Sequence, residues 1–141
     1  MIEFTVQGQP RGKARPRVIT AANGVTHAYT PQKTLDYEAE IQWAFRLAKI
    51  KEPFLGALRL EIIAFQNIPT DFNKEDRIKA LSGELRPMRK PDADNIAKII
   101  ADALNGLAYK DDNQIAELSV IKYYALEPYV KVKITELCLS T

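Results

Sequence analysis

One strongly amphipathic segment between Pro91 and Gly106 constrains the fold of this chain more than any other. Its apolar residues recur at i, i+3, i+4, i+7 and i+8, the spacing of one buried helix face: Ile96, Ile99, Ile100, Ala103, Leu104 and Leu107. Pro91 restricts the preceding residue to extended geometry, so the helix should begin at about Asp92 to Asp94. Asn105-Gly106 fits its C-terminal cap. The segment therefore predicts a buried helix with aspartates at its start.

The segments around this helix predict a sheet. Alternating apolar and polar residues predict strands at 2–7, 57–66, 114–124 and 129–137. Asn23-Gly24 predicts the turn of a hairpin between 18–20 and 25–28. Thr30-Pro31 fits an N-cap followed by a first helical proline, so a helix should run from about Pro31 to Lys49, and a short exposed helix is expected within 70–83. This order predicts one α+β domain over residues 1–141, a mixed β-sheet packed with helices.

Composition excludes several classes of protein. The 141 residues are 46% hydrophobic and 27% charged, as in ordinary globular proteins, and no apolar run approaches the length of a membrane span. Residues 1–10 alternate like a strand and do not resemble a signal peptide, so we expect a cytoplasmic protein.

Cys138, the one cysteine of the sequence, is interpreted as a small apolar residue on the last strand. With His27 the one histidine, chemistry has to come from carboxylates, lysine, hydroxyls or a hard metal ion.

The positive charge is concentrated in two short segments of a chain whose net charge is only +2. One follows the first strand and the other precedes the amphipathic helix: Arg11, Lys13, Arg15 and Arg17, then Arg86, Arg89 and Lys90. Two solvated basic loops would explain this pattern. Contact with the phosphates of a nucleic acid explains it equally well.

Aspartates flank the amphipathic helix on both sides. Inside a regular helix the side chains of Asp92 and Asp94 would point ~200° apart around the helix axis. If Asp92 is still extended where the helix begins, the two carboxylates can turn to the same side. Asp111 and Asp112 lie in the loop after the helix, and one of them can join this pair only if the following strand lies alongside the helix. Three such carboxylates suit Mg²⁺ or Mn²⁺. Lys98, one turn after Asp94, is then placed to touch a phosphate or orient a water molecule.

Simpler interpretations remain for each of these residues. Asp92 or Asp94 can act as a helix cap, Asp94 and Lys98 can form an ordinary i, i+4 pair, and the segment 111–113 can be a turn. Spacing alone leaves these alternatives open.

Longer strings in the chain resemble a known family. K-P-D-A-D-N at 90–95, Lys98, D-A-L-N-G at 102–106 and K-D-D-N-Q-I at 110–115 resemble the RusA family of Holliday junction resolvases, in the form found in phages and prophages of Gram-positive bacteria. G-K-A-R-P-R at 12–17 and I-P-T…G-E-L-R-P between 68 and 87 are similar to that form as well. The resemblance thus covers most of the chain. Ala93 stands where leucine is commoner, which removes no ligand.

The resemblance implies a Mg²⁺-dependent endonuclease, with Mn²⁺ as a substitute, that nicks four-way DNA junctions as a homodimer. The family's catalytic carboxylates fall on Asp92, Asp94 and Asp112, and its functional lysine falls on Lys98. Three further matches are given supporting roles. Asn95 and Asp111 would act by hydrogen bonding, and Asp102 by holding Lys98 or packing against the helix face.

The predicted function is therefore the resolution of four-way junctions by paired nicks, with the two basic segments holding the DNA arms. A metal nuclease that acts on flaps or forks is one rival. A non-catalytic protein that binds branched DNA is another, and a dimeric interaction protein without a DNA role is a third. Trp43 and Leu47 form a second apolar strip on the helix at 31–49, which favours core packing, with a dimer contact as the alternative.

Overall fold

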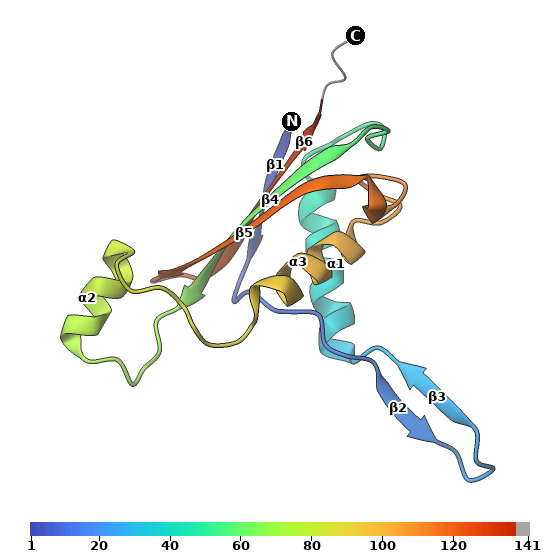
Figure 1. Cartoon of the computed structure of the whole chain (residues 1–141), viewed down its shortest axis with the longest axis horizontal. Coiled ribbons are helices and arrows are strands. Elements are labelled where there is room, and N and C mark those ends of the chain that lie inside the picture. Colours follow the sequence, from blue (N-terminus) through green and yellow to red (C-terminus); the bar gives the residue numbers. More distant parts are fainter. Residues whose placement is uncertain (138–141) are drawn as a thin grey trace.

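The alternating segments pair into one mixed sheet in the computed structural model, which describes residues 1–137 (Figure 1). Its four strands are β1 (Ile2–Gln7), β4 (Leu58–Asn67), β5 (Ile115–Ala125) and β6 (Tyr129–Glu136), in the order β1-β6-β4-β5. β4 and β5 are parallel, whereas the pairs β1–β6 and β4–β6 are antiparallel. The predicted element order and the single α+β domain with a mixed sheet are confirmed. Cys138, expected on the last strand, lies outside the described residues.

Two helices, α1 (Gln32–Arg46) and α3 (Ala93–Ala103), close the core on one face of this sheet (Figure 1). The predicted apolar stripe of α3 lies at the centre, since Ile96, Ile99 and Ile100 are fully buried. Each buried isoleucine stabilises the fold by about 1.5–3 kcal/mol. The stripe therefore sets the rotation of α3 about its axis and turns Asp94 and Lys98 toward solvent.

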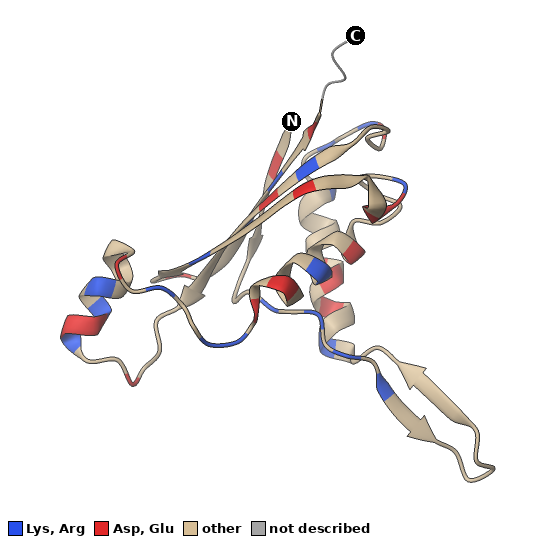
Figure 2. Cartoon of the chain, viewed as in Figure 1, with Lys and Arg blue, Asp and Glu red and all other residues tan. Residues whose placement is uncertain are grey.

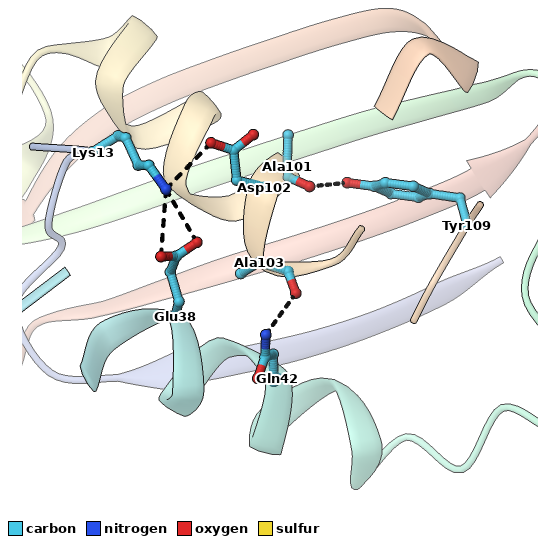
Figure 3. Close-up of polar contacts among 7 residues, drawn as sticks. All are labelled: Lys13, Glu38, Gln42, Ala101, Asp102, Ala103 and Tyr109. Carbon is cyan, nitrogen blue, oxygen red and sulfur yellow. Dashed lines mark hydrogen bonds and ion pairs between the residues drawn. The ribbon is translucent and has the colours of Figure 1, made fainter. Parts of the chain in front are cut away.

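The C-terminal end of α3 is held by two side chains from outside the helix (Figure 3). Tyr109 Oη donates a hydrogen bond to the Ala101 carbonyl at 2.6 Å, and Gln42 Nε2 donates to the Ala103 carbonyl at 3.1 Å. The last carbonyls of a helix lack partners within the helix, so these contacts satisfy them. They also fix the helix along its axis, and with it the aspartates at its start.

The ends of α1 differ from the prediction. Pro31 is the N-cap in extended geometry, with ψ 145°, and its carbonyl accepts from the N–H groups of Thr34 and Leu35. Thr30 therefore does not cap the helix. At the other end the N–H groups of Ala48 and Lys49 bond carbonyls three residues back, and Lys49 has a φ of 55°. This tightening of the chain ends the helix at Arg46 rather than at Lys49.

The remaining elements extend from the sheet and its helices. The hairpin of β2 (Arg17–Thr20) and β3 (Thr26–Tyr29) projects from one end of the molecule, and α2 (Lys74–Ser82) lies at the other (Figure 1). Asn73 caps α2 by accepting from Asp76 N–H at 2.8 Å, and Gly83 ends it with a φ of 84°. Both elements lie where the sequence predicts them. Within residues 1–137, no helix combines the length and hydropathy that a membrane crossing requires.

Candidate functional site

Asp92 is the N-cap residue of α3 and keeps extended backbone geometry, with φ −70° and ψ 149°. Its side chain makes no capping hydrogen bond. Asp92 therefore occupies the cap position, as one interpretation predicts, but its side chain does not cap the helix, and its exposed carboxylate remains available for a ligand. Asp94 lies in the first turn of the same helix and is exposed as well.

Asp112 is held by a short 3₁₀ turn, Asp112–Gln114, that precedes β5. Asp111 caps this turn, and Gln114 ties it to the rest of the fold. Gln114 Oε1 accepts from the N–H groups of Lys110 at 2.9 Å and Asp111 at 3.2 Å. Its Nε2 donates to the carbonyls that precede β4, of Phe54 at 2.9 Å and Gly56 at 3.0 Å. The position of Asp112 thus depends on side-chain bonds rather than on a long regular element.

The start of β5 lies beside α3, and this brings Asp94, Lys98 and Asp112 to one hollow of about 330 Å³. Its other walls are mostly apolar and come from α3 and β5: Ala97, Ala101, Ile115, Ala116 and Leu118. Asp92 lines a different hollow at the start of the same helix. Within residues 1–137 no three acidic, histidine or cysteine side chains lie close enough to share a metal ion. The structure therefore brings two of the three predicted ligands to one hollow.

The carboxylates around Asp112 crowd one another. A hydrogen bond shared with Asp111 raises the pKa of Asp112, as do partial burial and the charges of Asp111 and Asp102, while a hydrogen bond from Asn105 opposes the shift. A bound cation would relieve this repulsion. Mg²⁺ is commonly held by one or two carboxylates together with water and substrate phosphates. Asp94 and Asp112, as oxygen donors without competing nitrogen or sulfur groups, fit that donor set.

A basic cleft of about 560 Å³ adjoins Asp92. Its walls come from the chain after β1, the start of α1 and the residues around the start of α3, and they include Arg11, Lys13, Lys33, Lys90, Asp92 and Asn95. Figure 2 shows blue segments along the chain that runs from β1 toward the β2–β3 hairpin and along the separate chain that leads into α3. The cleft thus places positive charge around one proposed catalytic carboxylate.

The segment of residues 11–16, called the basic arm below, is packed tightly on α3. Lys13 N–H donates to the Asn95 carbonyl at 2.9 Å. A Cβ added at Gly12 would lie 2.8 Å from Asn95 Cβ, closer than side chains normally approach. Asn95 therefore holds the arm through its backbone carbonyl, and its side chain leaves no room for a Cβ at position 12.

The side chain of Lys13 is engaged by two carboxylates (Figure 3). Its Nζ lies 3.3 Å from Glu38 Oε2 and 3.4 Å from Asp102 Oδ2. Asp102 was expected to hold Lys98 or to pack against the helix face, but it pairs with Lys13, and no ion pair of Lys98 is formed within residues 1–137. Lys13 therefore clamps the basic arm between α1 and α3, and its charge is largely compensated before any DNA contact.

The second basic segment is also fixed to the fold. Arg86 lies over the Tyr123 ring at 3.9 Å, and Arg89 pairs with Asp71 at 3.0 Å. Lys122 Nζ donates to the Arg89 carbonyl at 3.0 Å. Of the three cations predicted in this segment, Lys90 is the one that lines the basic cleft.

Sequence reasoning missed two cations near Asp92. Lys33 lines the basic cleft from the first turn of α1. Burial lowers the pKa of Lys122, and the charge of Asp92 opposes that shift, so Lys122 lies within electrostatic reach of Asp92. Neither Lys33 nor Lys122 belongs to a cluster of basic residues in the sequence. They come close to Asp92 only because α1 and β5 pack near the start of α3 in the fold.

Asp112→Asn is expected to raise the melting temperature of the metal-free protein at pH 7 by about 1–2 °C. The pKa of Asp112 is higher in the folded protein than its ordinary value of 3.8, so the folded state loses stability as the pH rises through that raised pKa. The asparagine side chain does not ionise, so the variant does not lose this stability. Calorimetry in EDTA checks the result, and the advantage should vanish as the pH falls toward 3.8.

The exposed turn residue Glu127 supplies the control, since Glu127→Gln also removes one carboxylate and should leave the melting temperature unchanged. An equal or lower melting temperature for Asp112→Asn at pH 7 would contradict the crowding of Asp111 and Asp112.

Comparison with known proteins identifies the family of this chain. The family model described as Endodeoxyribonuclease RusA matches residues 7–135. The chain is also 36% identical over 137 residues to the uncharacterized protein YqaN of Bacillus subtilis (strain 168), and the match covers 96% of each chain. The RusA family comprises metal-dependent endodeoxyribonucleases and includes Holliday junction resolvases. By its sequence over nearly the whole length, this chain belongs to the RusA endodeoxyribonuclease family.

Proposed function

We propose that the protein is a Mg²⁺-dependent endodeoxyribonuclease that resolves four-way DNA junctions by paired symmetric nicks. One structural observation supports this proposal in addition to the family match. The start of α3 presents Asp94 and Lys98 to the same hollow as Asp112, while Asp92 faces a basic cleft. Carboxylates for a metal ion thus lie next to cations for the phosphate backbone.

Each group of the site has a distinct role in this proposal. Asp94 and Asp112 would hold Mg²⁺ or its substitute Mn²⁺, and Asp92, which lines the basic cleft at the start of the same helix, would act beside the scissile phosphate. When bound, the metal supplies an activated water molecule and positive charge at the scissile phosphate. Lys98 lies on the wall of the same hollow, where its ammonium group stabilises the charge that develops on the phosphate or orients the attacking water. In the hydrolysis the water oxygen would bond to phosphorus and the water would give up one proton, while the bond from phosphorus to the leaving oxygen breaks and that oxygen takes up a proton.

The basic cleft positions the substrate. Arg11, Lys33 and Lys90 line it, so they can contact consecutive phosphates on the strand to be cut. Such contacts recognise the path of the backbone rather than its bases, which suits an enzyme that selects branched DNA by shape.

A homodimer would supply two sites for the two nicks, because a four-way junction has approximate twofold symmetry. The second apolar strip of α1 is not core, since Trp43 is 64% exposed and Leu47 is 63% exposed. Together with Thr5 and Val6 these residues line a hollow of about 590 Å³ between α1 and β1. This face is our candidate for the dimer surface.

A cleavage assay on three synthetic substrates tests the function. With Mg²⁺, a mobile four-way junction should be cut at two symmetric positions, and a linear duplex should remain intact. EDTA should abolish the cuts and Mn²⁺ should restore them. Preferential cutting of a Y-fork or flap would replace junction resolution by the rival nuclease function. Junction binding without any metal-dependent nick would favour the non-catalytic DNA binder.

A further inference from the structure

The segment that contains the β2–β3 hairpin has an unusual charge. Residues 4–35 include no aspartate or glutamate, although the chain has 18 of them in 141 residues. The same segment carries five cations: Arg11, Lys13, Arg15, Arg17 and Lys33. Figure 2 shows the whole hairpin without acidic colour and the basic residues along the chain that leads into it. A surface of this charge complements a polyanion.

The hairpin exposes several large apolar side chains to solvent. It stands away from the sheet and the helices (Figure 1), and every residue of β2 and β3 is exposed. Val18 is 63% exposed, Ile19 is 55% exposed and Val25 is 46% exposed. Two-stranded ribbons are marginally stable in water by themselves. The ribbon is therefore suited to contact with another molecule.

The register of the hairpin sorts its side chains into two faces. Arg17 pairs with Tyr29 and Ile19 pairs with His27, and these four share one face because side chains alternate along a strand. This face combines a guanidinium, an aromatic ring, an imidazole and an aliphatic chain. Such groups bond phosphates, stack on sugars or bases and contact the thymine methyl group.

The hairpin is joined to the catalytic region through an anchored segment. The basic arm that precedes it is bonded to α3 at Asn95 and clamped by Lys13 between Glu38 and Asp102. Arg11 and Lys13 of the arm line the cleft that holds Asp92. A DNA strand seated in this cleft and continuing along the arm reaches the base of the hairpin at Arg17.

We propose that the β2–β3 hairpin is a DNA-binding arm that lies in the major groove of the duplex whose backbone occupies the basic cleft. The inference rests on the proposed DNA substrate. It adds a second region of DNA contact, separate from the proposed catalytic aspartates. A two-stranded ribbon fits the major groove, which is about 12 Å wide. Duplex DNA is favoured over a second copy of this chain because the segment 4–35 offers only cations and neutral groups, which complement phosphates.

The test introduces one negative charge on the hairpin. Ile19→Asp should weaken binding of a synthetic four-way junction about tenfold, since a carboxylate would face DNA phosphates where an apolar contact was lost. Val25→Asp, near the hairpin turn, is a second variant of the same kind. Ile78→Asp on α2 is the matched control, because Ile78 is 61% exposed, and it should bind like the parent. Fluorescence anisotropy in EDTA measures Kd without cleavage, and analytical ultracentrifugation measures the mass of each variant.

Each outcome separates this inference from the proposed function. Weaker junction binding by both hairpin variants at unchanged mass supports the DNA-binding arm. Parent-like Kd values for both variants overturn it and leave the nuclease proposal intact. A loss of mass with an unchanged Kd shows that the hairpin contacts a second copy instead, which overturns it as well. A parent protein that binds neither junction nor duplex overturns the proposed function together with the hairpin.

Discussion

Asp92→Asn is expected to reduce junction cleavage at least about a hundredfold while leaving the Kd for the junction within about twofold of the parent value. The amide keeps the size of the side chain but removes a negative charge that lines the basic cleft, where we propose the phosphate backbone lies. Because Asp92 makes no capping hydrogen bond in α3, the substitution should not unfold the helix start. The cations of the basic cleft remain, so binding should persist or tighten slightly. Single-turnover cleavage in Mg²⁺ and anisotropy in EDTA measure the two quantities separately.

A matched control comes from the first turn of another helix. Asp76 occupies the first turn of α2, away from the hollows that contain the proposed catalytic aspartates. Asp76→Asn should therefore cut junctions at the parent rate. If Asp92→Asn also cuts at the parent rate, the assignment of Asp92 to catalysis is wrong.

Gln114→Ala should lower the free energy of unfolding by about 2–3 kcal/mol, because hydrogen bonds of this kind contribute about 1 kcal/mol each and the two at the exposed turn contribute less. Its amide makes four hydrogen bonds: Oε1 accepts from the N–H groups of Lys110 and Asp111 at the turn before β5, and Nε2 donates to the carbonyls of Phe54 and Gly56 before β4. Without them Asp112 loses its fixed position opposite Asp94. We therefore expect kcat for junction cleavage to fall about tenfold with little change in Kd.

The neighbouring residue provides the comparison for this positioning effect. Asn113 bonds Asp111 Oδ1 through its backbone N–H, which Asn113→Ala retains. That variant should match the parent in urea unfolding and in cleavage. A stable Gln114→Ala protein with parent kcat would show that the turn holds Asp112 without Gln114.

The start of α3 could be predicted from the sequence because every local signal agrees there. Pro91 prevents an earlier start, and the apolar spacing from Ile96 onward defines one buried face. The ends of α1 were harder to predict. Pro31 can occupy the first helical position or the cap, and only the extended ψ of 145° in the structure distinguishes the two.

Contacts between distant parts of the chain explain the main difference at the site. Local spacing favours a pair between Lys98 and Asp102, four residues apart on one helix. In the structure Lys13 approaches Asp102 from the basic arm and brings Glu38 with it. A cation shared by two partly buried carboxylates outweighs an exposed i, i+4 pair. The path of the arm across α3 is a property of the assembled fold and has no signature in the spacing of charges.

The order of the strands has a consequence for how the enzyme is made in the cell. β6 is synthesised after the other three strands of the sheet, yet it lies between β1 and β4. Until β6 has been synthesised, β1 therefore has no neighbouring strand in the sheet. The start of the segment that follows β1 is then not held in place. A nascent or prematurely ended chain that lacks Tyr129–Glu136 cannot complete the core. The sheet that supports the candidate site is thus completed only after β6 has been synthesised.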